Sequence, residues 1–133
     1  MKIVILGSMR FIEEMLDVAT KLMEQGHKVH YSDKDAHDFG EVGSKEFNEK
    51  KSSWMKRHIE WIEESDAVLI LNLPALVDFD YTEESYIGAN TLGEIFISWY
   101  LGKKIYTIKS IPKNHPFYEE LSNMEVEVWN SKK

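Results

Sequence analysis

The sequence predicts an α/β fold of three layers, with a five-stranded parallel sheet between helices, as in flavodoxin- or Rossmann-like domains. Short apolar runs rich in β-branched residues alternate with longer segments in which apolar residues recur at helical spacing. Strands joined by helical crossovers form a parallel sheet with helices on its faces. No repeat and no Pro/Gly-rich linker interrupts the pattern, so we expect residues 1–133 to form a single domain.

Apolar runs predict the five strands, at residues 2–6, 28–32, 67–73, 104–108 and 125–129. The third run, AVLILNL, is the most apolar, which is typical of a strand buried on both faces, and we expect it at the centre of the sheet. In the last run Val126 and Val128 alternate with glutamates, as in an edge strand with one wet face.

Helical spacing predicts the segments between the strands. The first helix is expected at 9–25, where Gly26 ends it, and a long second helix follows the polar loop 33–43 and runs to about residue 64. A third helix carries Glu94, and a short one lies near 115–123. Residues 74–89 are expected to be a long loop, a kind of segment that often forms a lid or binding loop.

Composition excludes several classes of function. The net charge of −7, with 23 acidic against 16 basic residues, argues against a nucleic-acid partner or an anionic membrane surface. The absence of cysteine removes disulfides, thiolate metal sites and cysteine nucleophiles. The first apolar run is too short for a signal peptide or a membrane span, so we expect a cytoplasmic protein. The histidines, including those in 30–38, lack a metal-ligand spacing, and we expect neither a metal nor a cofactor.

Ligands of such sheets bind at the carboxyl ends of the strands, which makes the turn Gly7-Ser8-Met9-Arg10 a candidate site. Gly7 permits a tight turn, Ser8 can cap the following helix, and Arg10 can pair with a phosphate or carboxylate. A plain capped turn with Arg10 in solvent explains the same residues equally well.

Asn72 and two tyrosines are further candidates. Asn72 lies near the carboxyl end of the third strand, where its amide can hold a ligand hydroxyl or tie down the following loop. Tyr81 and Tyr86 can stack on a flat ligand or only pack the loop against the domain. His58 borders the apolar stripe of the second helix and is expected at the edge of the core.

Glu94 is the candidate catalytic residue, because it is a carboxylate inside an otherwise apolar helix. The stretch Thr91-Leu92-Gly93-Glu94 fits a capping box, in which the glutamate only reaches back to the cap residue. A glutamate near a helix start at the mouth of a parallel sheet would instead be a preorganised anionic nucleophile or base.

The turn 7–10, the strand SDAVLILN (65–72) and YIGANTLGE (86–94) followed by LGKKIY (101–106) together resemble the nucleoside 2-deoxyribosyltransferase superfamily, which includes the 2′-deoxynucleoside 5′-phosphate N-hydrolases. The spacing from Gly88 through Glu94 to Gly102-Lys103 looks like the nucleophile helix of that superfamily. The resemblance extends in order from the first strand to the fourth.

The resemblance implies an N-glycosidase or deoxyribosyltransferase that acts on a nucleoside or nucleoside 5′-monophosphate. Glu94 would attack the anomeric carbon and form a glycosyl ester, which water or a second base resolves with retention. The substrate pocket would be lined by Gly7, Ser8, Met9, Arg10, Asn72, Tyr86, Gly88, Asn90 and Gly93. The resemblance further implies a homodimer or larger assembly in which a neighbouring subunit completes the site.

Two alternatives stay open on the sequence. Transferases of the superfamily usually carry an aspartate where this chain has Asn72, which favours a non-catalytic nucleotide- or sugar-phosphate-binding module of the same fold. The third interpretation is an interaction domain in which Glu94 only caps its helix.

Overall fold

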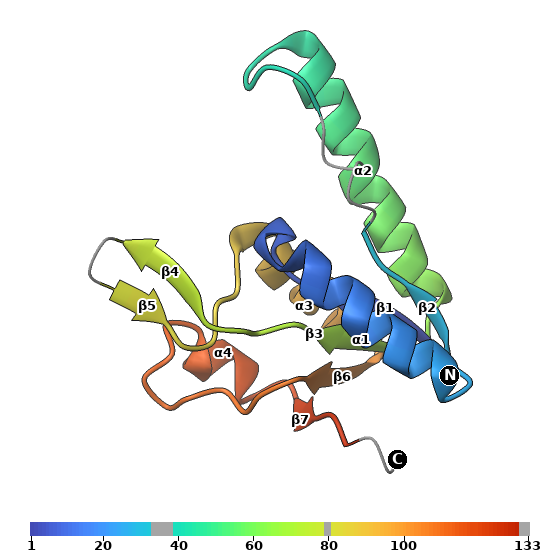
Figure 1. Cartoon of the computed structure of the whole chain (residues 1–133), viewed down its shortest axis with the longest axis vertical. Coiled ribbons are helices and arrows are strands. Elements are labelled where there is room, and N and C mark those ends of the chain that lie inside the picture. The colour runs from blue at the N-terminus through green and yellow to red at the C-terminus, as the bar shows by residue number, and fades with distance from the viewer. Residues whose placement is uncertain (33–38, 79–80, 131–133) are drawn as a thin grey trace.

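The computed structural model describes residues 1–32, 39–78 and 81–130, drawn in colour in Figure 1. The part of the 30–38 run that mixes histidine and aspartate beyond Ser32 lies outside the described residues. Within the described ranges, no helix has both the length and the apolar composition needed to cross a membrane.

Five strands form one sheet in the order β2-β1-β3-β6-β7, and every neighbouring pair is parallel. The strands are β1 (Lys2–Leu6), β2 (Lys28–His30), β3 (Ala67–Ile70), β6 (Lys104–Thr107) and β7 (Glu127–Val128). The predicted five-stranded parallel sheet is therefore confirmed, and β3 is its central strand. β2 is added on one side of β1, and the later strands β3, β6 and β7 are added on the other side. The strand order therefore switches between β1 and β3.

Helices cover both faces, as the predicted three layers require. They are the short η1 (Met9–Phe11), α1 (Ile12–Glu24), α2 (Lys45–Glu64), α3 (Ala89–Tyr100) and α4 (Tyr118–Leu121). Ser44 is the N-cap of α2, and its hydroxyl oxygen accepts a hydrogen bond from the Phe47 amide at 3.0 Å. Gly26 follows α1 with φ +93°, a left-handed conformation that glycine adopts without steric cost.

The alternating side chains of the strands build two cores. In the first core, Ile3 and Ile5 of β1 pack with Met15 and Leu22 of α1. Val4 and Leu6 point the other way and pack with side chains of α2, α3 and α4, among them Ile62, Ile95 and Leu121. The N-terminal part of α2 extends well beyond the sheet (Figure 1).

The segment expected as a loop at 74–89 contains an antiparallel hairpin of β4 (Ala75–Asp78) and β5 (Tyr81–Glu83). Its register pairs Ala75 with Glu83 and Leu76 with Thr82. The hairpin lies apart from the main sheet (Figure 1), and its Leu76 is exposed. The hairpin therefore lacks the alternation of buried and exposed side chains from which a strand is predicted.

Candidate active site

Glu94 lies in the second turn of α3 and does not cap the helix. The residue at the cap is Gly88, and Thr91 is buried within the first turn. The capping-box interpretation is therefore wrong, because the helix begins two residues before Thr91. Glu94 lies six residues after the cap, about 9 Å along the axis. Glu94 therefore lies beyond the first turn, where the stabilisation of a carboxylate by the helix dipole is largest.

The Glu94 carboxylate instead binds a histidine of the neighbouring helix. Its Oε2 lies 3.1 Å from Nδ1 of His58 on α2, and the two side chains are only 12% and 6% exposed. The other ring nitrogen, Nε2, lies 3.2 Å from the hydroxyl oxygen of Ser32, which is also buried. Ser32, His58 and Glu94 thus form a chain of hydrogen bonds from the end of β2 through α2 to α3.

The partners assign the proton of a neutral His58 imidazole. An ionised carboxylate only accepts hydrogen bonds, so Nδ1 must carry the proton and donate to Oε2. Nε2 is then unprotonated and accepts from the Ser32 hydroxyl, which can rotate to donate. The second oxygen of Glu94, Oε1, accepts no hydrogen bond from the described residues.

Two tryptophans of α2 hold the His58 ring. The ring centroid of Trp54 lies 4.2 Å away and that of Trp61 lies 4.9 Å away, with the second pair stacked. These residues precede and follow His58 by four and three positions, the spacing that brings side chains together on one helix face. His30 of β2 also stacks on Trp61, with the ring centroids 5.0 Å apart.

A cavity of about 180 Å³ opens beside Glu94, between α2 and α3. Its lining is mostly apolar: Trp54, Met55, Ile59, Ala89, Asn90, Gly93, Glu94 and Ile97. Gly93 borders open space, since a Cβ added at this position would meet nothing within 4 Å. The indole Nε1 of Trp54 is buried and has no hydrogen-bond partner among the described residues.

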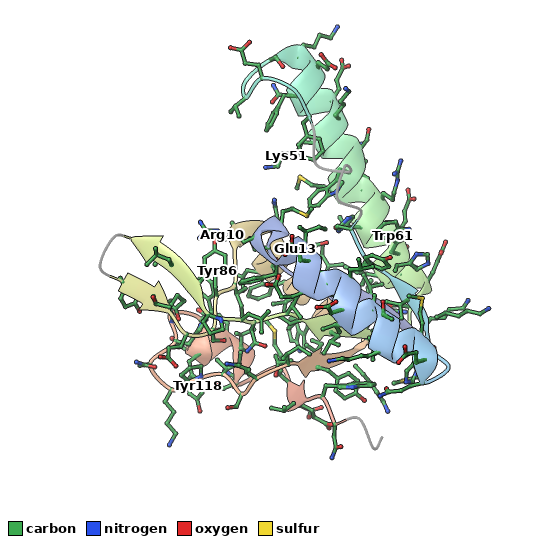
Figure 2. The ribbon with its side chains drawn as sticks, in the orientation of Figure 1. Arg10, Glu13, Lys51, Trp61, Tyr86 and Tyr118 are labelled. Carbon is green, nitrogen blue, oxygen red and sulfur yellow. The ribbon has the colours of Figure 1, made fainter. Side chains whose placement is uncertain are left out.

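Arg10 and Tyr86 form a second group, at the turn after β1. The side chains of Arg10 and Tyr86 lie close together (Figure 2), with the guanidinium 4.8 Å from the centre of the ring. The guanidinium also donates a hydrogen bond of 3.0 Å to the Leu76 carbonyl of β4. Phe11 meets the edge of the same ring at 6.3 Å. Arg10 is therefore anchored, although it stays exposed, rather than free in solvent.

Tyr86 connects this group with the start of α3. Its hydroxyl oxygen lies 3.5 Å from where a Cβ of Gly88 would be, so the ring packs against the cap of the helix. From there Asn90, Gly93 and Glu94 lie along α3 toward the cavity. Tyr86 and Gly88 thus lie just before α3, while Asn90, Gly93 and Glu94 lie on the helix itself.

The remaining residues of the first turn have structural contacts. Ser8 caps η1, and its hydroxyl accepts from the Arg10 amide at 3.3 Å. A Cβ at Gly7 would lie 3.1 Å from Cβ of Leu71, so only glycine fits without a shift. Met9 is half-buried in η1.

Asn72 is fully buried, and its amide is used entirely within the protein. Nδ2 donates to the Ser85 hydroxyl at 2.9 Å and to the Lys109 carbonyl at 2.8 Å. Oδ1 accepts from the amides of Ile108 and Lys109, both at 3.1 Å. These four bonds exhaust the hydrogen-bonding capacity of the side chain. Asn72 therefore joins the segments after β3 and β6, and it offers a ligand nothing while these bonds persist.

Tyr81 lies on the exposed hairpin, where its hydroxyl donates to Glu83 at 3.2 Å. This hydrogen bond, together with the charge of Glu83, raises the pKa of the phenol above its ordinary value of about 10. Lys103, at the end of the Gly88–Lys103 spacing, donates to the carbonyls of Glu63 and Ser65 and thus ties α3 to the end of α2.

A larger hollow of about 640 Å³ lies at the opposite, amino end of the strands. Met1, Lys104 and Glu127 are among the residues that line it. Parallel sheets bind ligands at the carboxyl ends of their strands, so we assign no substrate to this hollow.

Sequence reasoning missed His58, Ser32 and Trp54 as parts of the site. His58 is buried at the edge of the core, as expected. Its contact with Glu94, however, joins two residues that are 36 positions apart and lie on different helices. The one available signal was the spacing of Trp54, His58 and Trp61, which puts two large aromatic rings around a histidine on one helix face.

Comparison with known proteins places the fold in a class. No protein-family model and no curated protein sequence matches the chain. Solved structures do match: a 2-deoxyribosyltransferase of the psychrotolerant bacterium Bacillus psychrosaccharolyticus has a TM-score of 0.66 at 16% identity, over 99% of this chain and 88% of that chain. A CMP N-glycosidase of Clostridium botulinum has a TM-score of 0.54 at 17% identity, over 98% of this chain and 92% of that one.

The chain is a three-layer α/β/α protein of the Rossmann-like class. Within that class, its fold is similar to those of this 2-deoxyribosyltransferase and this CMP N-glycosidase, and the likeness extends over nearly the whole chain. The resemblance predicted from the sequence is confirmed at the level of the fold.

Proposed function

We propose that the protein cleaves the N-glycosidic bond of a nucleoside or nucleoside 5′-monophosphate, or transfers its (deoxy)ribosyl group, with Glu94 as the nucleophile. The observation that carries this proposal is the state of the Glu94 carboxylate. One oxygen is held by His58, the other is unpartnered among the described residues, and the side chain lines a mostly apolar cavity. A fold shared with a deoxyribosyltransferase and an N-glycosidase is consistent with that chemistry.

The reaction follows from this geometry. Oε1 attacks C1′ of the sugar while the bond from C1′ to the base breaks and its electron pair leaves with the base. The transition state has oxocarbenium character, which a nearby carboxylate stabilises, and the mostly apolar lining strengthens that interaction. Water or a second base then attacks C1′ of the ester, and two inversions give net retention.

The groups around Glu94 suggest how the substrate lies. The sugar would occupy the space beside Gly93, with the Asn90 amide available to its hydroxyl groups. One N–H of Arg10 donates to the Leu76 carbonyl, and the other guanidinium N–H groups donate to no described residue. These free N–H groups of Arg10 would bind a 5′-phosphate beside Tyr86 and the turn of Gly7, Ser8 and Met9. Gly88 would lie between the phosphate and the sugar.

A second copy of the chain is proposed as the partner that completes the site. Phe96, Trp99 and Tyr100 on α3 are exposed, and Tyr100 keeps 84% of its surface in solvent. A contiguous apolar surface of this kind on one helix is typical of an interface. The same helix also lines the cavity, and the neighbouring copy would pack on a different, exposed face of it.

The alternative is a nucleotide-binding module without turnover. It is favoured by Asn72, whose neutral amide cannot supply a proton to the leaving base and is engaged in four structural bonds. Among the described residues that line the cavity, Glu94 is the one carboxylate. A binding module would be stabilised by a nucleotide without releasing its base.

A base-release assay separates the two functions. The purified protein is incubated with ribo- and deoxyribonucleosides and their 5′-monophosphates, and free base is quantified by chromatography. Release that disappears in Glu94→Gln and persists in Glu60→Gln, an exposed glutamate of α2, supports the enzyme. Thermal stabilisation by a nucleotide with no base released from any of the panel supports the binding module.

A further inference from the structure

We infer that His58 is a positioning residue for Glu94: it binds Oε2, orients the carboxylate and leaves Oε1 as the oxygen that attacks C1′. This inference rests on the function proposed above, because it assigns a role within that reaction. It is carried by three contacts, the hydrogen bonds of His58 to Glu94 and Ser32 and the packing of its ring between tryptophans.

The His58 ring has one orientation that satisfies these contacts. Turning the ring over would replace Nδ1 by a carbon at Oε2 and remove Nε2 from Ser32, so both hydrogen bonds would be lost. The ring is also confined by Trp54 at 4.2 Å and Trp61 at 4.9 Å. A side chain held in this way presents its Nδ1–H to a fixed point, and that point is Oε2 of Glu94.

The carboxylate needs such a partner, because it is largely withdrawn from water. A buried charge is costly unless it is hydrogen-bonded, and His58 provides the side-chain hydrogen bond that Glu94 has among the described residues. With Oε2 engaged, Oε1 keeps the lone pairs that a nucleophile needs. The imidazole thus distinguishes two oxygens that are chemically equal in a free carboxylate.

The hydrogen bond persists through both steps of the reaction. When C1′–Oε1 forms and the base departs with the electron pair of the C1′–N bond, Oε2 becomes the carbonyl oxygen of the ester and still accepts Nδ1–H. The leaving base takes a proton from solvent. When water attacks C1′, the electron pair of C1′–Oε1 returns to the carboxylate, and the water gives its proton back to solvent. His58 neither gains nor loses a proton.

Ser32 supports the tautomer on which this role depends. The Glu94 carboxylate places the proton of the neutral ring on Nδ1, and the Ser32 hydroxyl then donates to the unprotonated Nε2. Such an outer hydrogen bond orients a functional side chain without touching the substrate. Ser32 is therefore a second positioning residue, one step further from the reaction.

Three variants test the inference. His58→Phe keeps an aromatic ring between the tryptophans but removes both nitrogens, His58→Asn offers an amide N–H close to the place of Nδ1–H, and Ser32→Ala removes the outer bond. We expect His58→Phe to lower kcat by about tenfold or more. KM should change much less, because His58 does not touch the substrate. His58→Asn should recover part of the lost kcat, and Ser32→Ala should have a smaller effect than His58→Phe.

Nitrogen NMR of ¹⁵N-histidine-labelled protein supplies a readout that does not need turnover. The signal absent from His58→Phe identifies His58, and its two nitrogen shifts report which atom carries the proton. The inference predicts protonated Nδ1 in the wild type. It is overturned by a proton on Nε2, or by a folded His58→Phe protein with wild-type kcat. If the wild type shows protonated Nδ1 but releases no base, the proposed function fails while the positioning contact stands.

Discussion

Nδ1 of His58 and Oε2 of Glu94 meet at 3.1 Å where α2 packs against α3, although both side chains are almost entirely withdrawn from solvent. This contact gives Glu94 an environment that a helix cap would not have. It orients a carboxylate at the edge of a cavity of about 180 Å³, in a fold shared with a deoxyribosyltransferase and an N-glycosidase.

Replacing Gly93 by alanine is expected to stabilise the protein and to impair substrate binding. Alanine is a better helix former than glycine by about 1 kcal/mol, and nothing lies within 4 Å of the added Cβ. The same methyl group projects where the sugar is proposed to lie, so KM should rise. Thermal unfolding and steady-state kinetics measure the two effects on one variant. An unchanged KM would show that the sugar lies elsewhere.

Replacing Asn72 by alanine is expected to destabilise the fold by about 3 kcal/mol, because it leaves several buried partners unsatisfied. Urea unfolding measures the loss. Nucleotide binding, measured by calorimetry below the unfolding transition, should persist, since the amide is engaged within the protein. A variant of normal stability that no longer binds nucleotide would assign Asn72 to the ligand instead.

Replacing Lys103 by methionine is expected to cost about 1–2 kcal/mol of unfolding free energy, because the ammonium donates to two carbonyl groups at the end of α2. Lys104→Met, at the neighbouring exposed position, is the matched control and should change stability by less than about 0.5 kcal/mol. Equal effects of the two substitutions in urea unfolding would show that the contacts of Lys103 contribute nothing.

The proposed assembly predicts that the chain elutes as a dimer or larger species in size-exclusion chromatography with light scattering. Introducing a charge at an exposed apolar position of α3, as in Trp99→Glu, should shift the protein to monomer. Leu16→Glu, at an exposed apolar position of α1, is the control that should leave the mass unchanged. A monomeric wild type at micromolar concentration would refute the assembly.

The sequence predicted the architecture well because the fold depends on short-range patterns. The runs at 2–6, 67–73 and 104–108 contain the strands β1, β3 and β6 of a parallel sheet, and the most apolar run contains the central strand. The hairpin β4–β5 was missed, because Leu76 and its neighbours are exposed and show no buried periodicity.

The site was predicted in part, because its details depend on contacts between distant segments. Glu94 and Gly93 line a cavity, while their roles toward a substrate stay predictions. The capping box was wrong, since the start of α3 is set by Gly88, and no local motif indicates that start. The contact of His58 with Glu94 and the four bonds of Asn72 depend on how the helices and loops pack, which the spacing of residues along the chain does not encode.

The most direct test of the central claim is detection of a covalent glycosyl ester on Glu94. The wild-type protein is mixed with a substrate identified by base release, quenched in acid and digested, and its peptides are weighed by mass spectrometry. We predict that the peptide with Glu94 gains the mass of one (deoxy)ribosyl group, and that Glu94→Gln shows neither this adduct nor base release. Base release by Glu94→Gln at the wild-type rate would show that Glu94 is not the nucleophile.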